Sequence, residues 1–427
     1  MTTVNRKNQV ISWFISALFV IIVPQQTRAE EIKEYPTKSD SILIAYLNEQ
    51  GIRTTHSNEI QLLASGQEKF IDLFQAIEQA KHHIHLEYFN FRNDSIANSL
   101  FNLLEKKADE GVEVRALYDA FGNSSNNRPL KKKHIKSIRE RGIEIVEFDP
   151  IKFPWINHVF HRDHRKIVVI DGQIGYTGGM NIADYYINGL PEIGEWRDMH
   201  IRITGKAVED LQNIFLDMWN KCTNQKIGGT AYYPLRDIAI DLQLPNKEIA
   251  IVDRYPRKTP EVMRRVYARA IEHAEKKVQI INPYFTPTRI IKKAIKRAIK
   301  KGVKVEIMIP GKSDIPFTPD AALYIANKLR KKGAEIYIFN GGFHHSKIMM
   351  IDSIYCTVGS TNLNSRSLRY DYEVNAFIFD KETTQELIDI FNTDKNNSTL
   401  LTSEMYRKRT PWKKFIGWFA HLFTPFL

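Results

Sequence analysis

Two copies of one short pattern decide the fold of this chain: HRKIVVID at residues 164–171 and HSKIMMID at residues 345–352. Each copy has a histidine, a lysine two residues later and an aspartate five residues after the lysine. The copies are 181 residues apart, and the register continues beyond them, because GGMN at 178–181 matches GSTN at 359–362. One such pattern is a weak signal, but two in the same register indicate an internal duplication.

The segments around the two motifs repeat as well. Hydrophobic periodicity predicts helix, strand, helix and strand in each half, with a glycine after each helix. These elements are expected over 95–109, 112–118, 131–141 and 143–148 in the first half, and over 289–301, 303–309, 319–332 and 334–339 in the second. Alternating helices and short apolar strands indicate an α/β fold. We therefore expect two tandem α/β sandwich units, each with a mainly parallel sheet, packed about a pseudo-twofold axis.

The repeat also predicts how the chain is divided. We expect the first unit over residues 38–223 and the second over 251–400. Residues 224–250, which contain Gly228, Pro234 and Pro245, are expected to link them. Residues 401–427 form a basic amphipathic C-terminal tail.

The N-terminal segment, residues 1–29, has the pattern of an export signal. Arg6 and Lys7 precede an apolar stretch over 10–23, and polar residues follow it. The stretch has 14 residues, whereas a membrane-spanning helix needs about 20. A cleaved signal peptide and an uncleaved membrane anchor both stay open, and either predicts that the rest of the chain is exported.

The amino-acid composition indicates which class of molecule the chain binds. The chain has 427 residues, a formal net charge of +12 and 43% hydrophobic residues, as expected for a globular protein with an anionic partner. Nucleic acid and acidic lipid surfaces both fit this charge. Cys222 and Cys356 have no metal-ligand or disulfide spacing, and Cys356 lies in an apolar run expected to be a buried strand.

The residues of the repeated motif suit a phosphodiester. A histidine and a lysine two residues apart on a strand lie on the same face. If the two units pack about a pseudo-twofold axis, two histidines, two lysines and two asparagines meet in one pocket. These are His164, Lys166, Asn181, His345, Lys347 and Asn362. Lysine and asparagine can stabilise phosphoryl oxygens, while one imidazole attacks and the other donates a proton. This chemistry needs no metal and no cofactor.

Asp171 and Asp352 close the two motifs. Each ends an apolar strand and precedes Gly172 or Ser353. We therefore expect these aspartates to fix the geometry of the turn and not to touch the phosphate.

With these features the chain resembles the phospholipase D superfamily, and within it the bacterial cardiolipin synthases with two HKD motifs. The resemblance runs from about residue 60 to the C-terminus, and includes WRDMH at 196–200, NPYF at 282–285 and Arg366-Ser367. It implies two phospholipase D-like units and a phosphatidyltransferase that makes cardiolipin from phosphatidylglycerol. Together with the export signal, it implies a protein at an anionic membrane surface, on the periplasmic or outer face of a bacterial inner membrane.

The resemblance further implies roles for individual residues. Asp198 and Glu373, about 30 positions after the motif histidines, are expected to orient the imidazoles. His164 is expected to be the nucleophile that forms a phosphatidyl-histidine, and His345 the general acid and then the general base. Ser360 joins Asn181 and Asn362 in supporting the phosphate.

Two histidine patterns and one basic helix each have a structural interpretation beside the functional one. His158, His161 and His164 are three apart, which suggests a metal site, but the segment runs into a strand, so the first two are expected at the pocket rim. His82, His83 and His85 have no counterpart in the second half and are interpreted as structural. The basic helix over 289–301 is either a solvated face or a lipid-binding face.

The tail also permits two interpretations. Aromatic and aliphatic residues share one stripe, beside a basic cluster at 407–409 and 413–414; the stripe comprises Trp412, Phe415, Ile416, Phe419 and Phe423. Such a helix fits a membrane interface, but it can equally pack on the protein's own core.

Three functions remain compatible with the sequence. The first is phosphatidyl transfer to a second lipid, which gives cardiolipin. The second is a secreted phospholipase D that passes the same intermediate to water and forms phosphatidic acid. The third is a metal-independent nuclease or phosphodiesterase, which the basic charge permits, although the aromatic tail favours lipid over nucleic acid.

Overall fold

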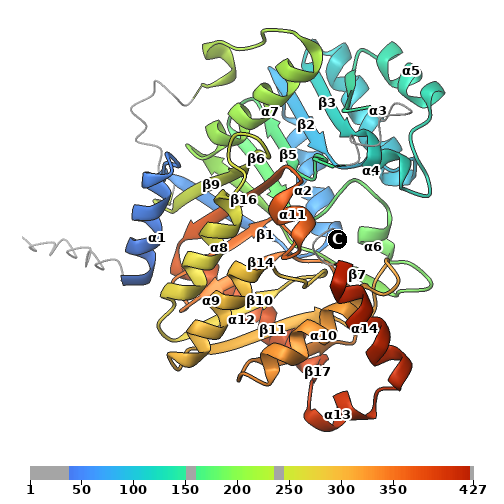
Figure 1. Cartoon of the computed structure of the whole chain (residues 1–427). Coiled ribbons are helices and arrows are strands. Elements are labelled where there is room, and N and C mark those ends of the chain that lie inside the picture. The colour runs from blue at the N-terminus through green and yellow to red at the C-terminus, as the bar shows by residue number, and fades with distance from the viewer. Residues whose placement is uncertain (1–37, 151–159, 235–244, 424–427) are drawn as a thin grey trace, which may run out of the picture. The chain divides into compact units, whose positions relative to one another are not determined.

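The computed structural model describes residues 38–150, 160–234 and 245–423 (Figure 1). The N-terminal segment predicted to direct export lies outside these residues. From α1 (Lys38–Glu49) onwards the described chain forms one compact unit. Within it the duplicated halves each form a large sheet.

The sheet of the first half has seven strands in the order β1-β8-β6-β5-β2-β3-β4. These strands are β1 (Asn58–Leu63), β2 (His83–Tyr88), β3 (Glu113–Asp119), β4 (Glu144–Phe148), β5 (Lys166–Ile170), β6 (Ile174–Gly178) and β8 (His200–Gly205). The helices are α2 (Gly66–Glu78), α3 (Ser95–Asp109), α4 (Ala120–Ser124), α5 (Lys132–Glu140), α6 (Tyr185–Asn188) and α7 (Val208–Thr223).

The sheet of the second half has eight strands in the order β17-β12-β11-β10-β14-β15-β16-β9. These are β9 (Glu248–Arg254), β10 (Lys277–Ile281), β11 (Lys304–Pro310), β12 (Glu335–Phe339), β14 (Ile348–Ile351), β15 (Tyr355–Gly359), β16 (Glu373–Phe379) and β17 (Ser398–Leu400). The helices are α8 (Val262–His273), α9 (Arg289–Lys300), α10 (Thr318–Arg330), α11 (Ser365–Arg369) and α12 (Lys381–Asn396).

The sheets are mixed, so the prediction of mainly parallel sheets is wrong. Only β2, β3 and β4, and likewise β10, β11 and β12, are mutually parallel. The motif strands β5 and β14 run antiparallel to β2 and β10. A tight turn follows each motif strand and returns the chain as an antiparallel neighbour, which needs no crossover helix. The helix–strand repeat covers only the parallel part of each sheet.

The two sheets pack against each other. The helices α2 and α3 of the first half and α8 and α9 of the second half cover the outer faces, whereas α7 and α12 contribute to the apolar layer that the halves share. Alternate residues of β5 show why: Ile167 and Val169 belong to the apolar layer shared with the second half, whereas Val168 and Ile170 face the first half's own helices. The same alternation holds along β14, because side chains on a strand point to opposite faces. Strands buried on both faces need the continuous apolar runs seen in both motifs.

Two predicted boundaries differ from the structure. The helix α1, which was assigned to the first unit, packs against α8 of the second half, and Leu43 and Leu47 lie in that half's core. The strand β9 begins at Glu248, inside the segment predicted as a linker, and pairs with β16. Cys356 is buried on β15, as expected.

The C-terminal tail forms α13 (Ser403–Lys408) and α14 (Pro411–Phe423), and α14 packs on α10 (Figure 1). Gly417 permits the close approach, since an added Cβ would lie 2.6 Å from the Asp320 carbonyl oxygen. Across the residues that the structure describes, no helix has the length and apolar character needed to cross a membrane.

Candidate active site

The two motifs meet because short backbone pairings join the halves beside each motif. The strand β13 (Gly342–His344), just before the second motif, pairs with β7 (Glu195–Arg197) of the first half. At the equivalent position beside the first motif, Asp163 forms an isolated β-bridge with Tyr372 of the second half. The amide of His164 donates to the Tyr372 carbonyl at 3.1 Å, and that of His345 donates to the Arg197 carbonyl at 2.6 Å. Each motif histidine therefore lies beside the acidic segment of the opposite half.

Each imidazole is held by a carboxylate from the other half. The Nδ1 atom of His164 lies 3.0 Å from Oε1 of Glu373, and the Nδ1 atom of His345 lies 2.6 Å from Oδ2 of Asp198. Both carboxylates are fully buried. A carboxylate at Nδ1 fixes the ring orientation and leaves Nε2 as the nitrogen that can meet a substrate. Neither half-site is complete without the other half.

The motif lysines are buried beside the histidines. Lys166 and Lys347 each donate from Nζ to the carbonyl of their own motif histidine at 2.5 Å, and Lys347 Nζ is also 2.7 Å from His345 Nδ1. Burial lowers the pKa of Lys166 to about 7 and that of Lys347 to about 8, although the nearby carboxylates oppose the shift. A bound phosphodiester anion would favour their charged forms, because an opposite charge within a few ångströms raises an ammonium pKa.

The two carboxylates differ in their surroundings. Burial raises the pKa of Glu373 to about 7, and the Ser360 hydroxyl donates to its Oε2. Burial acts in the same direction on Asp198, but Lys347 and His345 outweigh it and lower its pKa. The position equivalent to Ser360 is Gly179, where an added Cβ would lie only 2.1 Å from Asp198 Oδ1. The glycine therefore makes room for Asp198.

Both imidazoles favour the neutral form. Burial and then Lys166 lower the pKa of His164 well below its usual value. Burial and Lys347 also lower the pKa of His345, but Asp198 opposes them. The ionised Asp198 is therefore the group that can stabilise a protonated His345.

Asp171 and Asp352 lie at the far ends of the motif strands from the histidines. Each carboxylate accepts hydrogen bonds of 2.7–2.9 Å from three successive backbone amides at the start of the neighbouring strand, residues 81–83 and 275–277. Both residues have positive φ, 53° and 55°. The structure thus places them at the strand-to-turn junctions.

The two motif asparagines are buried at 5% exposure, and neither side-chain oxygen has a hydrogen-bond partner among the described residues. Lys69, which no sequence signal distinguished, is fully buried and donates to the carbonyls of Met180 and Asn181 at 3.3 and 3.0 Å. It therefore fixes the backbone that carries Asn181.

Aromatic rings surround the histidines. His345 contacts the rings of Trp196, Tyr284 and Phe343 at 5.2–6.0 Å between centroids, and Phe89 lies 5.2 Å from His164. Trp196 and Tyr284 belong to segments that carried the family resemblance. Phe89 and Phe343 were missed, because a single aromatic residue beside a strand gives no sequence signal.

The other histidines lie apart from this chemistry. His158 is outside the described residues, and His161 bonds through Nδ1 to the Tyr370 carbonyl at 2.8 Å. His83 and His85 are buried within an aromatic cluster that includes Tyr232. In the part of the chain that the structure describes, no group of three or more His, Cys, Asp or Glu side chains is arranged to hold a metal ion.

Comparison with known proteins agrees with this geometry. The family described as "Cardiolipin synthase, PLD-like domain" matches residues 73–219 and 267–395, one segment in each half. The cardiolipin synthase of Listeria monocytogenes serotype 4b is 37% identical over 94% of this chain and 85% of its own length. That of Staphylococcus aureus strain Mu50 is 39% identical over 87% of this chain and 74% of its own length.

Among solved structures, the phosphatidylserine synthase of Haemophilus influenzae superposes with a TM-score of 0.69 at 16% identity, covering 92% of this chain and all of that one. At this identity the likeness shows a shared fold. With its duplicated sheets, crossed half-sites and extended similarity to the Listeria and Staphylococcus proteins, the chain belongs to the cardiolipin synthases, a phosphatidyltransferase family with the phospholipase D-like fold.

Proposed function

We propose that this protein makes cardiolipin from two molecules of phosphatidylglycerol through a phosphatidyl-histidine on His164. The observation that carries this assignment is the crossed pairing of each motif histidine with a carboxylate of the opposite half. Burial lowers the pKa of both motif histidines, but at His345 the ionised Asp198 opposes the shift and can stabilise a protonated imidazole, whereas the pKa of His164 is well below its usual value. A neutral nucleophile and a protonated acid are what the first step requires.

In the first step, His164 Nε2 attacks phosphorus of one phosphatidylglycerol. A nitrogen–phosphorus bond forms, the bond from phosphorus to the headgroup oxygen breaks, and glycerol leaves with a proton from His345. In the second step, the neutral His345 takes the proton of a headgroup hydroxyl on another phosphatidylglycerol. That oxygen attacks phosphorus and His164 leaves, which gives cardiolipin. Lys166 and Lys347 stabilise the charge on the phosphoryl oxygens in both steps.

We also propose that the protein works at the surface of an anionic membrane after export, with α14 as the contacting element. Four of its aromatic side chains, the aromatic ridge, are exposed: Trp412, Phe415, Trp418 and Phe419. Basic residues precede and interrupt the ridge, from Arg407 to Lys414. Aromatic and basic side chains on one helix suit the interface between headgroups and acyl chains.

The covalent intermediate gives the direct test. Purified protein is mixed with phosphatidylglycerol vesicles, quenched under alkaline conditions that preserve nitrogen–phosphorus bonds, and digested for mass spectrometry. We expect the phosphatidyl group on the peptide that contains His164, and cardiolipin and glycerol among the products. Modification of His345 alone would reverse the two roles, and absence of cardiolipin would refute the proposed function.

A further inference from the structure

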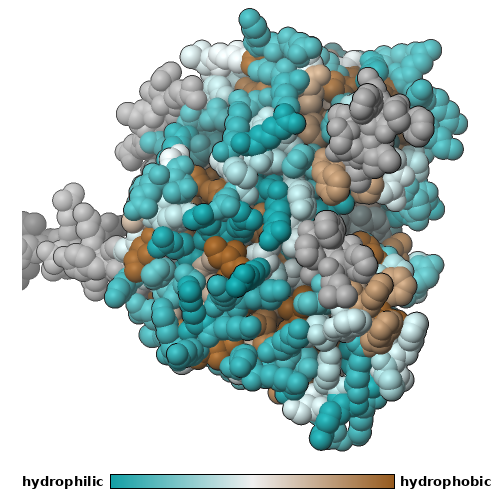
Figure 2. All heavy atoms as spheres, viewed as in Figure 1, coloured by the Kyte–Doolittle hydropathy of each residue, from teal (hydrophilic) through white to brown (hydrophobic). Residues whose placement is uncertain are grey.

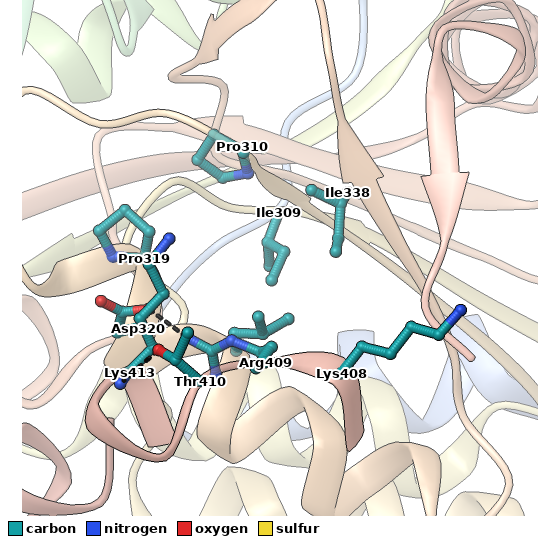
Figure 3. A pocket seen from close by; sticks show the side chains of 11 residues that line it. Ile309, Pro310, Pro319, Asp320, Ile338, Lys408, Arg409, Thr410 and Lys413 are labelled. Atoms are coloured by element: carbon teal, nitrogen blue, oxygen red, sulfur yellow. Dashed lines mark hydrogen bonds and ion pairs between the residues drawn. The ribbon is translucent and has the colours of Figure 1, made fainter. Parts of the chain in front are cut away.

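A cavity of about 350 Å³ lies between the C-terminal tail and the body of the second half (Figure 3). Its walls come from the ends of β11 and β12, the first two turns of α10, and the junction of α13 and α14. We call it the tail pocket. None of its lining residues takes part in the proposed catalytic steps.

The polar side of the tail pocket carries an excess of positive charge. Lys408, Arg409 and Lys413 line it, against one carboxylate, Asp320. Arg409 forms an ion pair with Asp320, and Lys408 one with Glu404 outside the cavity at 2.7 Å. Lys413 has no carboxylate within ion-pair distance among the described residues. Its ammonium group is therefore the one most available to an anion.

The opposite side of the tail pocket is apolar. Ile309, Leu323 and Ile338 line it together with Pro310 and Pro319, and Figure 3 shows the isoleucines across the cavity from Arg409 and Lys408. A free inorganic anion gains nothing from such a wall. A molecule with a phosphate group and an adjoining apolar part can use both sides.

The duplication supplies an internal comparison. A second cavity of about 350 Å³ lies at the end of β4, the strand equivalent to β12. It is lined by Glu147 and Asp149 as well as Lys221 and Arg257, so its charged groups balance. The excess of positive charge is thus specific to the tail pocket and does not come from the fold alone.

The position of the tail pocket suits a lipid. It lies at the carboxyl ends of β11 and β12, and the same edge of the sheet carries His345, because β14 begins opposite the end of β10. Neighbouring strands are about 4.8 Å apart. The same tail carries the aromatic ridge, and Figure 2 shows hydrophobic atoms where α14 lies in Figure 1, beside a largely hydrophilic surface.

We propose that the tail pocket binds one anionic phospholipid of the bilayer as a non-reacting ligand, with the phosphate at Lys413 and Arg409 and the apolar part against Leu323 and Ile338. The bound lipid fixes α14 on the membrane with the motif histidines facing the same surface. This inference rests on the proposed function in one respect, that the protein works on a bilayer.

Matched variants distinguish a pocket from general electrostatic attraction. Full-length protein is titrated with phosphatidylcholine vesicles that contain phosphatidylglycerol, and binding is followed by sedimentation. Lys413→Gln removes the pocket cation, while Lys414→Gln removes the next lysine, whose Nζ donates to the Arg407 carbonyl. Leu323→Trp fills the cavity without changing charge. Thermal unfolding of each variant checks that it is folded.

We expect Leu323→Trp to weaken vesicle binding at least fivefold, and Lys413→Gln to weaken it at least threefold more than Lys414→Gln. General attraction predicts equal losses for the two lysines, since each contributes about the same near an anionic surface, and no loss for the folded Leu323→Trp. That outcome would overturn the proposal. If Leu323→Trp does not fold, the comparison of the two lysine variants decides alone.

Two further arms complete the test. Inorganic phosphate at millimolar concentration should not displace the protein from vesicles beyond a chloride control of equal ionic strength. Displacement by phosphate alone would show an anion site without lipid selectivity and overturn the lipid assignment. Cardiolipin formation by the unaltered protein is measured in parallel, so that a failure of the proposed function is seen separately from a failure of the pocket.

Discussion

The two carboxylates that hold the imidazoles belong to a glutamate and an aspartate, whose side chains differ in length by one methylene group. Each side-chain length matches its surroundings. Glu373 reaches His164 while accepting from Ser360, whereas Asp198 reaches His345 across a glycine that leaves it room. The half-sites are therefore symmetric in plan but not in electrostatics. This asymmetry is the physical basis for giving the two histidines different roles.

Replacement of either motif histidine should abolish turnover. His164→Ala and His345→Ala should each lower the rate of cardiolipin formation by at least about 10²-fold, because nucleophile and acid act in one cycle and general acid–base catalysis alone contributes about 10²- to 10⁴-fold. The exposed His56 provides the control as His56→Ala, which should keep its rate. A single motif variant with more than about a tenth of the normal rate would contradict the shared site.

The pH dependence of kcat/KM should show which histidine is the acid. An anion beside an imidazole raises its pKa, so Asp198→Asn should lower the pKa of His345. His345 then loses its proton at lower pH, and the alkaline limb of the profile should move to lower pH while the acid limb stays. If the acid limb moves instead, the roles of His164 and His345 are reversed.

At the scale of the elements, the motif strands are held at both ends. The histidine end is tied to the opposite half by backbone hydrogen bonds, and the aspartate end is tied to the neighbouring strand by three amides. The pattern HxKxxxxD is thus one structural element: a strand of fixed length with chemistry at one end and an anchor at the other. This explains why the aspartate belongs to the motif although it is remote from the histidine.

Loss of an anchoring aspartate should reduce stability more than chemistry. Asp352→Ala leaves three amides without their acceptor and puts alanine at a φ of 55°, so we expect a loss of about 2–3 kcal/mol in the free energy of unfolding. Asp352→Asn should lose less, since asparagine tolerates this conformation. Denaturant unfolding measures both, with the exposed Asp109→Ala as the control. A folded Asp352→Ala with a strongly raised KM would place this residue at the substrate.

The tail helix combines the two interpretations that the sequence left open, because one face of α14 packs on α10 while its aromatic ridge is exposed. Substituting Trp412, Phe415 and Phe419 by serine should weaken vesicle binding by at least tenfold, since each loses apolar area that a bilayer would bury. Ile71→Ser on α2, an equally exposed apolar residue, is the control. Sedimentation equal to that of the unaltered protein would refute the interfacial role of the ridge.

At the scale of the whole molecule, the duplication could be predicted from the sequence, because both motifs, their glycines and their flanking elements keep one register. The mixture of parallel and antiparallel strands in each sheet could not be predicted, because apolar strands have the same sequence pattern whichever way their neighbours run. The crossed partnership of His164 with Glu373, and of His345 with Asp198, depends on how the halves pack, which local spacing does not encode. Phe343, which contacts Trp196 of the first half, was missed for the same reason, whereas Lys69 was missed because its bonds to Met180 and Asn181 depend on the fold of its own half.

The choice of acceptor is the property of the whole assembly that separates a cardiolipin synthase from a phospholipase D. The proposed phosphatidyl-histidine can be attacked by water or by a lipid alcohol. An alcohol held in place can compete with water, because well-oriented groups reach effective molarities of about 10⁵ to 10⁸ M. Protein held on a bilayer also meets phosphatidylglycerol at high local density.

With phosphatidylglycerol vesicles as the only substrate, we therefore expect cardiolipin and glycerol to exceed phosphatidic acid, with products identified by mass spectrometry. Excess glycerol should reverse the reaction, because it offers the same intermediate a competing alcohol. Dilution of phosphatidylglycerol with phosphatidylcholine should raise the share of phosphatidic acid, since fewer acceptor hydroxyls then reach the site while water stays constant. Phosphatidic acid as the main product at every lipid density would show that the fold holds its donor lipid but does not position an acceptor.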